Sequence, residues 1–205
     1  MAENIYIYEY KDGLYFNLTN RCTNACDFCI RNEPSGVRGT GSLWLDEEPD
    51  AAEVIAVLDG YDLSAYSEAI FCGYGEPTMR LDVLCEVARE LKRRAPQLPV
   101  RINTNGQANL YYGEDVTGKL VGIIDVVSVS LNAPSANVYS ALCHSDYGRD
   151  AFPGILEFAQ LCRDKGISVA FTVVDTIGQE NIEACQKLSY DMGIPLRVRH
   201  YNEDV

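Results

Sequence analysis

The sequence predicts an α/β fold: a partial, TIM-like (β/α)6 barrel with parallel strands and an N-terminal β-hairpin extension. Three observations lead to this prediction. Short β-prone runs alternate with amphipathic helical segments, which requires right-handed crossovers and a parallel sheet. Six such strands are too few for an eight-stranded barrel. Each polar cluster follows a strand directly, as in barrels, which favours the partial barrel over a flat doubly wound sheet.

The N-terminal extension is predicted to be a β-hairpin. Residues 5–10 and 14–18 are rich in β-branched and aromatic side chains. Asp12 and Gly13 lie between these runs, and an Asp-Gly step in that position is a strong hairpin signal. The second arm of the hairpin leads directly to Cys22.

The first helix is marked at both ends. It follows a glycine-rich loop through Gly41, and apolar side chains recur at helical spacing over residues 51–58. Asp50 and Glu53 are spaced as a capping box, and Gly60 is placed as the stop. We therefore expect a helix between these signals.

The rest of the chain repeats the strand and helix unit without repeating its sequence. The further strands are expected at residues 69–72, 100–104, 124–131, 168–174 and 196–201. The further helices are expected at residues 81–94, 134–142, 150–165 and 180–192. No low-complexity linker divides the chain, so residues 1–205 are predicted to form a single domain.

The overall charge argues against a general nucleic-acid-binding surface. The chain has 205 residues, 47% hydrophobic content and a net charge of -13, whereas nonspecific nucleic-acid affinity comes chiefly from Lys and Arg. A local exception is expected where Arg21, Arg31 and Arg38 flank a group of cysteines.

The cysteine usage and the N-terminus predict a cytoplasmic protein. Of the eight cysteines, five are scattered singly, which does not suggest a secreted disulfide framework. The N-terminus lacks a positive region followed by an apolar stretch, and no apolar run approaches membrane-spanning length. We therefore expect no membrane association.

The remaining three cysteines predict a metal cluster. Cys22, Cys26 and Cys29 have the spacing C-x3-C-x2-C. Iron–sulfur clusters are usually held by four thiolates, so three leave one iron of a 4Fe-4S cube without a protein ligand. Zinc is the main alternative, but a structural zinc site needs four ligands, and no second cysteine pair or nearby histidine completes this set. Chance clustering is a third interpretation.

Two loops that follow strands combine glycine with polar groups. In residues 73–77, glycine permits close approach of the backbone to a ligand, and Glu76 offers a carboxylate to a cationic group. Asn103 and Thr104 can hydrogen-bond to hydroxyl groups. Each loop taken alone could be an ordinary turn.

A file of polar residues occupies the next strand. Ser128, Ser130 and Asn132 alternate with apolar residues and should point to one side of the sheet. Inside a barrel each unsatisfied group would cost roughly 1–3 kcal/mol. A bound polar cofactor would provide the missing partners.

Together these motifs resemble the radical S-adenosylmethionine (SAM) superfamily over nearly the whole chain. The cysteine loop is similar to the superfamily's cluster motif, including the aromatic Phe28 before the third cysteine. The run Tyr74, Gly75, Glu76 and Pro77 is similar to its GGEP motif, which recognises the methionine amino group. Tyr74 departs from the first glycine of that motif.

The resemblance implies further contacts to SAM. Asn103 and Thr104 match strand-end positions that commonly contact the ribose. Ser130 and Asn132 match polar positions on the next strand, and Val174 matches an apolar position that contacts adenine.

The resemblance also implies an activity. Cys22, Cys26 and Cys29 would bind a 4Fe-4S cluster, with a flavodoxin or ferredoxin as the expected reductant. Reductive cleavage of SAM would then yield a 5′-deoxyadenosyl radical that abstracts hydrogen from an unidentified substrate. The alternative is an iron–sulfur electron carrier, or a regulatory module that binds SAM or a cluster without radical catalysis. The downstream polar file favours the enzyme, because a carrier does not need it.

Within the superfamily, the chain resembles the small proteins named for their association with TatD-family nucleases. The segments that carry this likeness are LTNRCTN at 18–24, FCGYGEPT at 71–78, RINTNG at 101–106 and VSLNAP at 129–134. The name implies a possible link to a TatD-type nuclease as a partner.

A few residues near the strand ends have less defined roles. Cys72 could donate a hydrogen atom or contact the substrate. The alternative is an ordinary buried side chain, because free cysteine is among the most buried residue types. Residues 200–201 could face the substrate or pack at the chain end. Tyr6, Tyr8 and Tyr10 alternate along one strand, and a half-buried sheet face is their simplest explanation.

Overall fold

The computed structural model describes residues 4–32 and 40–201, in which seven strands form one sheet in chain order. β1 (Ile7–Tyr10) pairs antiparallel with β2 (Gly13–Phe16), and each later strand pairs in parallel with the one before it. These strands are β3 (Glu68–Phe71), β4 (Val100–Thr104), β5 (Val126–Ser130), β6 (Ser168–Val174) and β7 (Leu196–Arg199). The sheet of the described residues does not close on itself, so the predicted open, partial barrel with an N-terminal hairpin is confirmed.

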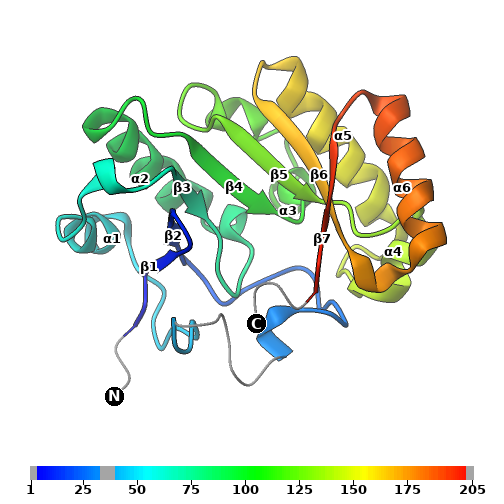
Figure 1. The fold of residues 1–205 in the computed structure, drawn as a ribbon, viewed down its shortest axis with the longest axis horizontal. Coiled ribbons are helices and arrows are strands. Elements are labelled where there is room, and N and C mark those ends of the chain that lie inside the picture. The colour runs from blue at the N-terminus through cyan, green and yellow to red at the C-terminus, as the bar shows by residue number, and fades with distance from the viewer. Residues whose placement is uncertain (1–3, 33–39, 202–205) are drawn as a thin grey trace.

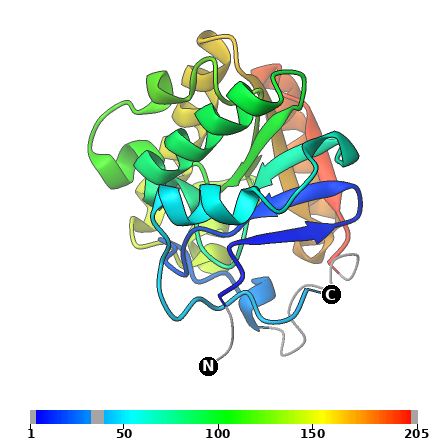
Figure 2. The same cartoon turned by 90° about the vertical axis from the view of Figure 1, so that its left-hand side faces the viewer.

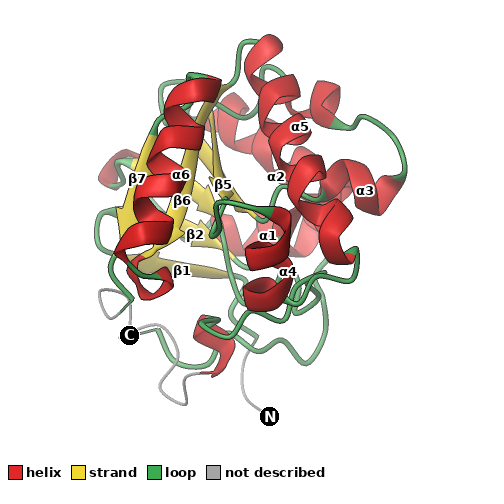
Figure 3. Ribbon diagram, turned by 90° about the vertical axis from the view of Figure 1, so that its right-hand side faces the viewer, coloured by secondary structure: helices red, strands yellow, loops and turns green. Residues whose placement is uncertain are grey.

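Helices lie along the outer side of the curved sheet (Figure 3). They are α1 (Ala51–Leu58), α2 (Leu81–Arg94), α3 (Ala108–Tyr112), α4 (Ala136–Cys143), α5 (Ala151–Asp164) and α6 (Gln179–Met192). The hairpin of β1 and β2 forms one edge of the sheet beside α1 (Figure 2), and β7 forms the other edge.

The ends of α1 follow from local side-chain chemistry. Asp50 Oδ1 accepts a hydrogen bond from the Glu53 backbone N–H at 2.8 Å, and Glu53 Oε2 accepts one from the Asp50 N–H at 2.8 Å. This is the capping box expected from the sequence. The helix ends at Leu58, two residues before Gly60.

The two faces of the sheet differ in polarity. In β4, Val100 and Ile102 are buried in the apolar core, whereas Arg101 and Asn103 lie on the opposite, inner face. The same alternation in β5 buries Val127 among the core residues. The apolar outer face therefore packs against the helices, and the inner face is left to polar side chains.

Several details differ from the sequence prediction. The five-residue α3 was not expected, because it is too short to show helical periodicity. Short 3-10 helices also join the main elements, at Ile30–Asn32, Leu63–Ala65, Pro77–Arg80, Thr117–Leu120, Gly148–Asp150 and Asp175–Ile177. Part of the glycine-rich loop before Gly41, including Arg38, lies outside the described residues.

Candidate active site

A cavity of about 280 Å³ lies on the inner face of the sheet, at the ends of the parallel strands. Figure 1 shows the segment of residues 22–32 beyond these strand ends. The cavity is lined by every site residue that the sequence predicted, namely Cys22, Cys26, Phe28, Cys29, Cys72, Tyr74, Gly75, Glu76, Asn103, Thr104, Ser130, Asn132 and Val174. Residues up to 152 positions apart in the chain are thus brought to one place.

The three cysteines of the motif are partly exposed along the cavity wall. No group of three or more His, Cys, Asp or Glu residues in the described ranges is arranged to hold a single metal ion. A 4Fe-4S cluster does not require such convergence, because each thiolate binds a different iron. The donor set therefore fits a cluster better than a mononuclear zinc ion, whose ligands must meet at one point.

The protein surroundings favour the protonated form of two of these thiols. Burial and the charge of Glu76 raise the pKa of Cys22 to about 12. The neighbouring Cys143 thiol and burial raise the pKa of Cys26. Since thiolates are the ligand form, loading of a metal cluster must release protons here.

The cysteine loop is held by a buried network of amide and hydroxyl groups. Gln107 lies at its centre: its Nε2 donates to Asn24 Oδ1 at 2.9 Å and to the Tyr139 hydroxyl at 3.0 Å. Its Oε1 accepts from the Thr23 hydroxyl at 2.8 Å and from the Ser145 hydroxyl at 3.0 Å. One buried side chain therefore satisfies groups on the two residues that follow Cys22, on Tyr139 of α4 and on Ser145 just after that helix. Sequence reasoning did not single out this residue.

Removal of the Gln107 amide is expected to destabilise the protein. In Gln107→Met the side chain keeps its length, but buried groups of Thr23 and Asn24 lose a partner, at about 1–3 kcal/mol for each. Denaturant unfolding should show a lower free energy of unfolding, with Gln160→Met on the outer helix α5 as the control. Equal stability of the two variants would show that the network does not hold the loop.

The loop also docks on the end of α4. The Ala25 N–H donates to the Cys143 carbonyl at 3.0 Å, and the Asp27 N–H donates to the Leu142 carbonyl at 3.1 Å. The last carbonyls of a helix lack partners within the helix. The cysteine loop satisfies two of them, so α4 supports the loop directly.

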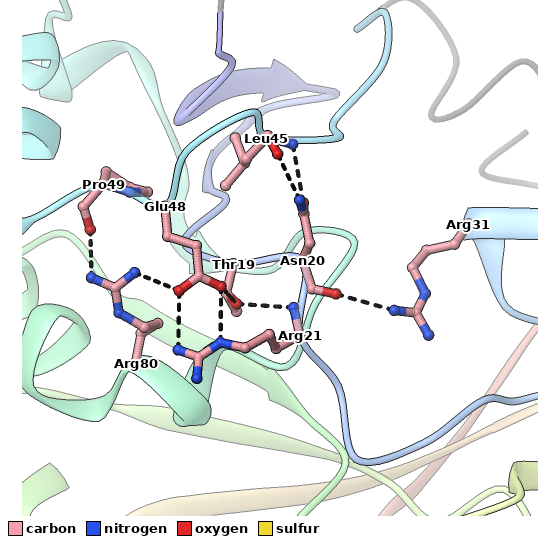
Figure 4. Close-up of polar contacts among 8 residues, drawn as sticks. All are labelled: Thr19, Asn20, Arg21, Arg31, Leu45, Glu48, Pro49 and Arg80. Carbon is pink, nitrogen blue, oxygen red and sulfur yellow. Dashed lines mark hydrogen bonds and ion pairs between the residues drawn. The ribbon is translucent and has the colours of Figure 1, made fainter.

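On the other side of the loop, Glu48 joins three groups from two loops (Figure 4). Its carboxylate accepts a hydrogen bond from the Thr19 hydroxyl. It also accepts one from Arg21 Nε and one from Arg21 Nη2, both at 3.0 Å. It also accepts from Arg80 Nη1 at 2.9 Å, and Arg80 Nη2 donates to the Pro49 carbonyl at 2.7 Å. We call this the Glu48 bridge. It fixes the residue before Cys22 relative to the segment that follows Glu76.

Glu76 is buried, and its carboxylate is oriented by the protein itself. Oε1 accepts from the Thr78 N–H at 3.0 Å and from the hydroxyls of Thr78 and Thr104 at 2.6 and 2.7 Å. Among the described residues, Oε2 accepts a hydrogen bond only from the Asn105 N–H, at 2.7 Å. Burial raises the pKa of Glu76, and the hydrogen bonds from Thr78 and Asn105 act in the opposite direction. Since each carboxylate oxygen can accept two hydrogen bonds, Oε2 retains an acceptor position for a cationic group.

Thr104, for which the resemblance implies a ribose contact, lines the cavity and also contacts Glu76. Its hydroxyl donates to Glu76 and accepts from the Gly106 N–H at 3.0 Å. The residue lines the cavity, but its hydroxyl is already engaged in holding the carboxylate.

Glycine is required at Gly75 by contact with the cysteine loop. A Cβ atom there would lie 2.3 Å from the Thr19 carbonyl oxygen and 2.6 Å from the Arg21 carbonyl oxygen. The Glu76 N–H donates to the same Arg21 carbonyl at 2.7 Å. Two loops of the site are therefore packed backbone to backbone, with no room for a side chain between them.

The polar file lies on the cavity side, as its alternation predicts. Ser128, Ser130 and Asn132 all line the cavity. Asn132 has a φ of 54°, and its Oδ1 is buried without a hydrogen-bond partner among the described residues. A donor on a bound molecule, such as a hydroxyl group, would satisfy this oxygen. Val174 offers a buried apolar contact nearby in the same cavity. These residues fit a polar cofactor with an apolar portion.

Other lining residues were missed as site residues from the sequence. Arg101, Arg197 and Arg199 line the cavity from β4 and β7, and Tyr15 joins them from β2. Tyr8 and Tyr10, expected only on a half-buried sheet face, line it as well. Residues two positions apart on a strand point to the same face of the sheet, so Arg101 could have been placed beside Asn103 on the cavity side. The same spacing places Arg197 and Arg199 on one face.

Comparisons with known proteins agree with this arrangement. The chain is 31% identical to GTP 3',8-cyclase of Paenarthrobacter nicotinovorans over 93 residues, which are 44% of this chain and 24% of the cyclase. It has the fold of Streptococcus suis SuiB bound to the precursor peptide SuiA, with a TM-score of 0.70, 17% identity and coverage of 96% of this chain and 41% of SuiB. A radical SAM methyltransferase from Sphaerobacter thermophilus gives a TM-score of 0.66 and 16% identity, covering 95% of this chain and 68% of the enzyme.

The chain spans about a quarter of the cyclase and less than half of SuiB, so these likenesses concern a shared core. A sequence model of the Radical SAM superfamily matches residues 16–188, which include the three motif cysteines and every strand from β3 to β6. This match covers most of the chain, and the protein therefore belongs to the radical SAM superfamily.

Proposed function

We propose that the protein is a radical SAM enzyme that holds a 4Fe-4S cluster through Cys22, Cys26 and Cys29 and acts on a substrate not yet identified. The observation that carries this proposal is the shared cavity. The three thiols line it together with the oriented carboxylate of Glu76 and the unpaired Oδ1 of Asn132. A structure of SuiB bound to S-adenosylmethionine shares the fold, which supports the same general use of the cavity.

The side chains of this protein would bind and orient the cofactor. Glu76 Oε2 has an acceptor position for an ammonium group, and Asn132 Oδ1 has one for a hydroxyl. Val174 and Phe28 provide apolar contact that excludes water. When bound, the cluster and SAM supply reductive cleavage of the sulfonium to a 5′-deoxyadenosyl radical, which abstracts hydrogen from the substrate.

The proposal is tested by product formation without a known substrate. The full chain is reconstituted anaerobically with iron and sulfide, then given dithionite and SAM, and 5′-deoxyadenosine is measured by chromatography. Radical chemistry predicts that this product accumulates above a control without dithionite. An intact cluster that yields no 5′-deoxyadenosine would instead favour an electron carrier or a regulatory SAM-binding module.

The proposed partners and location follow from the sequence motifs and the cysteines. The four segments quoted above support a link to a TatD-type nuclease, and the cluster chemistry supports a flavodoxin or ferredoxin as reductant. A reducing cytoplasm is supported by the eight cysteines, all within the described ranges, which form no disulfide. No helix of the described residues has the length and apolar character needed to cross a membrane.

A further inference from the structure

The inner face of the sheet carries a group of arginines that the proposed cofactor contacts do not use. Arg197 and Arg199 on β7 and Arg101 on β4 all line the cavity. Among the described residues that line it, the single carboxylate is Glu76, and that carboxylate already accepts hydrogen bonds at both oxygens. A protein with a net charge of -13 therefore concentrates positive charge inside its candidate active site.

The three arginines differ in how their charge is balanced. Arg101 forms a two-pronged ion pair with Glu68, at 2.8 Å from Nε and 2.6 Å from Nη2, and its Nη1 donates to Asn103 at 2.7 Å. Arg197 and Arg199 form no ion pair with any residue of 4–32 or 40–201. The Arg199 Nε is buried and has no hydrogen-bond acceptor within the same ranges. A buried donor without an acceptor is costly, and an oxyanion is the acceptor that a guanidinium best accommodates.

The cavity also has an aromatic wall. The rings of Tyr8 and Tyr15 are stacked with centroids 5.1 Å apart, and Tyr10 packs edge-on against Tyr15 at 5.9 Å. These residues come from β1 and β2, at the opposite edge of the sheet from β7. A molecule that touches both walls would need a flat or apolar part and a negative group.

We propose that this part of the cavity binds an anionic substrate, with its carboxylate or phosphate held by Arg199 and Arg197 and its flat part against the tyrosine wall. The inference rests on the proposed function in one respect, since that function makes the bound molecule a substrate. Arg101 lines the same cavity, but its charge is balanced by Glu68. A guanidinium group binds a carboxylate or a phosphate through the same pair of parallel hydrogen bonds, so the arginines fit a substrate that carries either group.

Binding of small probes tests the proposal without requiring turnover. The full chain, reconstituted anaerobically, is titrated by calorimetry with benzoate, phenyl phosphate and neutral benzyl alcohol. Benzoate, phenyl phosphate or both should bind at least about tenfold more tightly than benzyl alcohol, and Arg199→Met should weaken that binding by about tenfold. Arg199→Lys should fall between the two, because it keeps the charge without the fork. The preferred anion identifies which group the substrate carries.

Two further variants keep the test decisive. Arg93→Met is the matched control, since the Arg93 side chain is 69% exposed on α2, and it should bind the probes as the unmodified protein does. If Arg199→Met does not fold, Arg197→Met on the same strand takes its place.

Three results would overturn the proposal. The first is equal binding of anionic and neutral probes by the unmodified protein. The second is unchanged anion binding by Arg199→Met with increased aggregation, which would mean that the arginines only protect the edge strand β7 from pairing. The third is displacement of the probes by SAM, which would assign the arginines to the cofactor's own carboxylate. Failure of the proposed function is a separate result: probes would bind, but no 5′-deoxyadenosine would form.

Discussion

Cys29→Ala is expected to lose the iron–sulfur cluster and to reduce 5′-deoxyadenosine formation by at least about a hundredfold. Mutation of residues that only hydrogen-bond to a metal ligand already lowers metal affinity or activity by about 10–100-fold, and Cys29 is a proposed ligand itself. Three thiolates are already fewer than the usual four, so the loss of one leaves two irons without a protein ligand. The measurements are iron content, Mössbauer spectrum and product formation after anaerobic reconstitution.

The matched control for this variant is Cys185→Ala. Cys185 is buried in α6 and does not line the cavity, so its replacement removes a packed sulfur without touching the site. Full cluster content and product formation in Cys29→Ala would contradict the assignment. A single metal ion bound at four thiolates in the unmodified protein would contradict it as well.

Gly75→Ala is expected to lower the free energy of unfolding by about 3 kcal/mol, the upper part of the range for overpacking. The added Cβ would meet backbone oxygens of Thr19 and Arg21 at 2.3 and 2.6 Å, and backbone cannot rotate away as a side chain can. The two loops must separate, which also strains the hydrogen bond from the Glu76 N–H to the Arg21 carbonyl. The midpoint temperature of thermal unfolding and the iron content after reconstitution should both be lower than in the unmodified protein.

Gly118→Ala provides the comparison for this effect. Among the described residues, a Cβ at Gly118 would come within 4 Å of a single atom, Lys165 Cε at 3.9 Å. This variant should keep the stability and iron content of the unmodified protein. If Gly75→Ala behaves in the same way, the contact between the two loops is not a requirement of the site.

The sequence predicted the elements that have a strong local signal. The Asp-Gly hairpin, the capping box of α1 and the span of α2 at residues 81–94 depend on neighbours in the chain, and the structure confirms all three. The helix α3 was missed because five residues do not establish a period. The strand predicted at residues 124–131 is shorter in the structure, at Val126–Ser130, although the Leu131 N–H still donates to the Thr172 carbonyl at 2.9 Å.

The candidate site was predicted less completely, because its support comes from distant segments. Gln107 contacts Thr23 across 84 positions and Asn24 across 83, and no local pattern signals such a contact. Arg199 was assigned to the last strand but not to the cavity, since a charged residue on an edge strand is expected to face water. Thr104 was placed correctly at the strand end, whereas its contact with Glu76 depends on the neighbouring loop.

The Glu48 bridge has a consequence for the order of events during synthesis and folding. The contacts of Glu48 with Arg21 and Arg80 span 27 and 32 positions, so they close only after two long segments of chain have met. Loop closure of this length delays such contacts until local hairpins and helices have formed. The ligands for iron should thus become ordered late, and metal delivered to a nascent chain would meet them before they are in place.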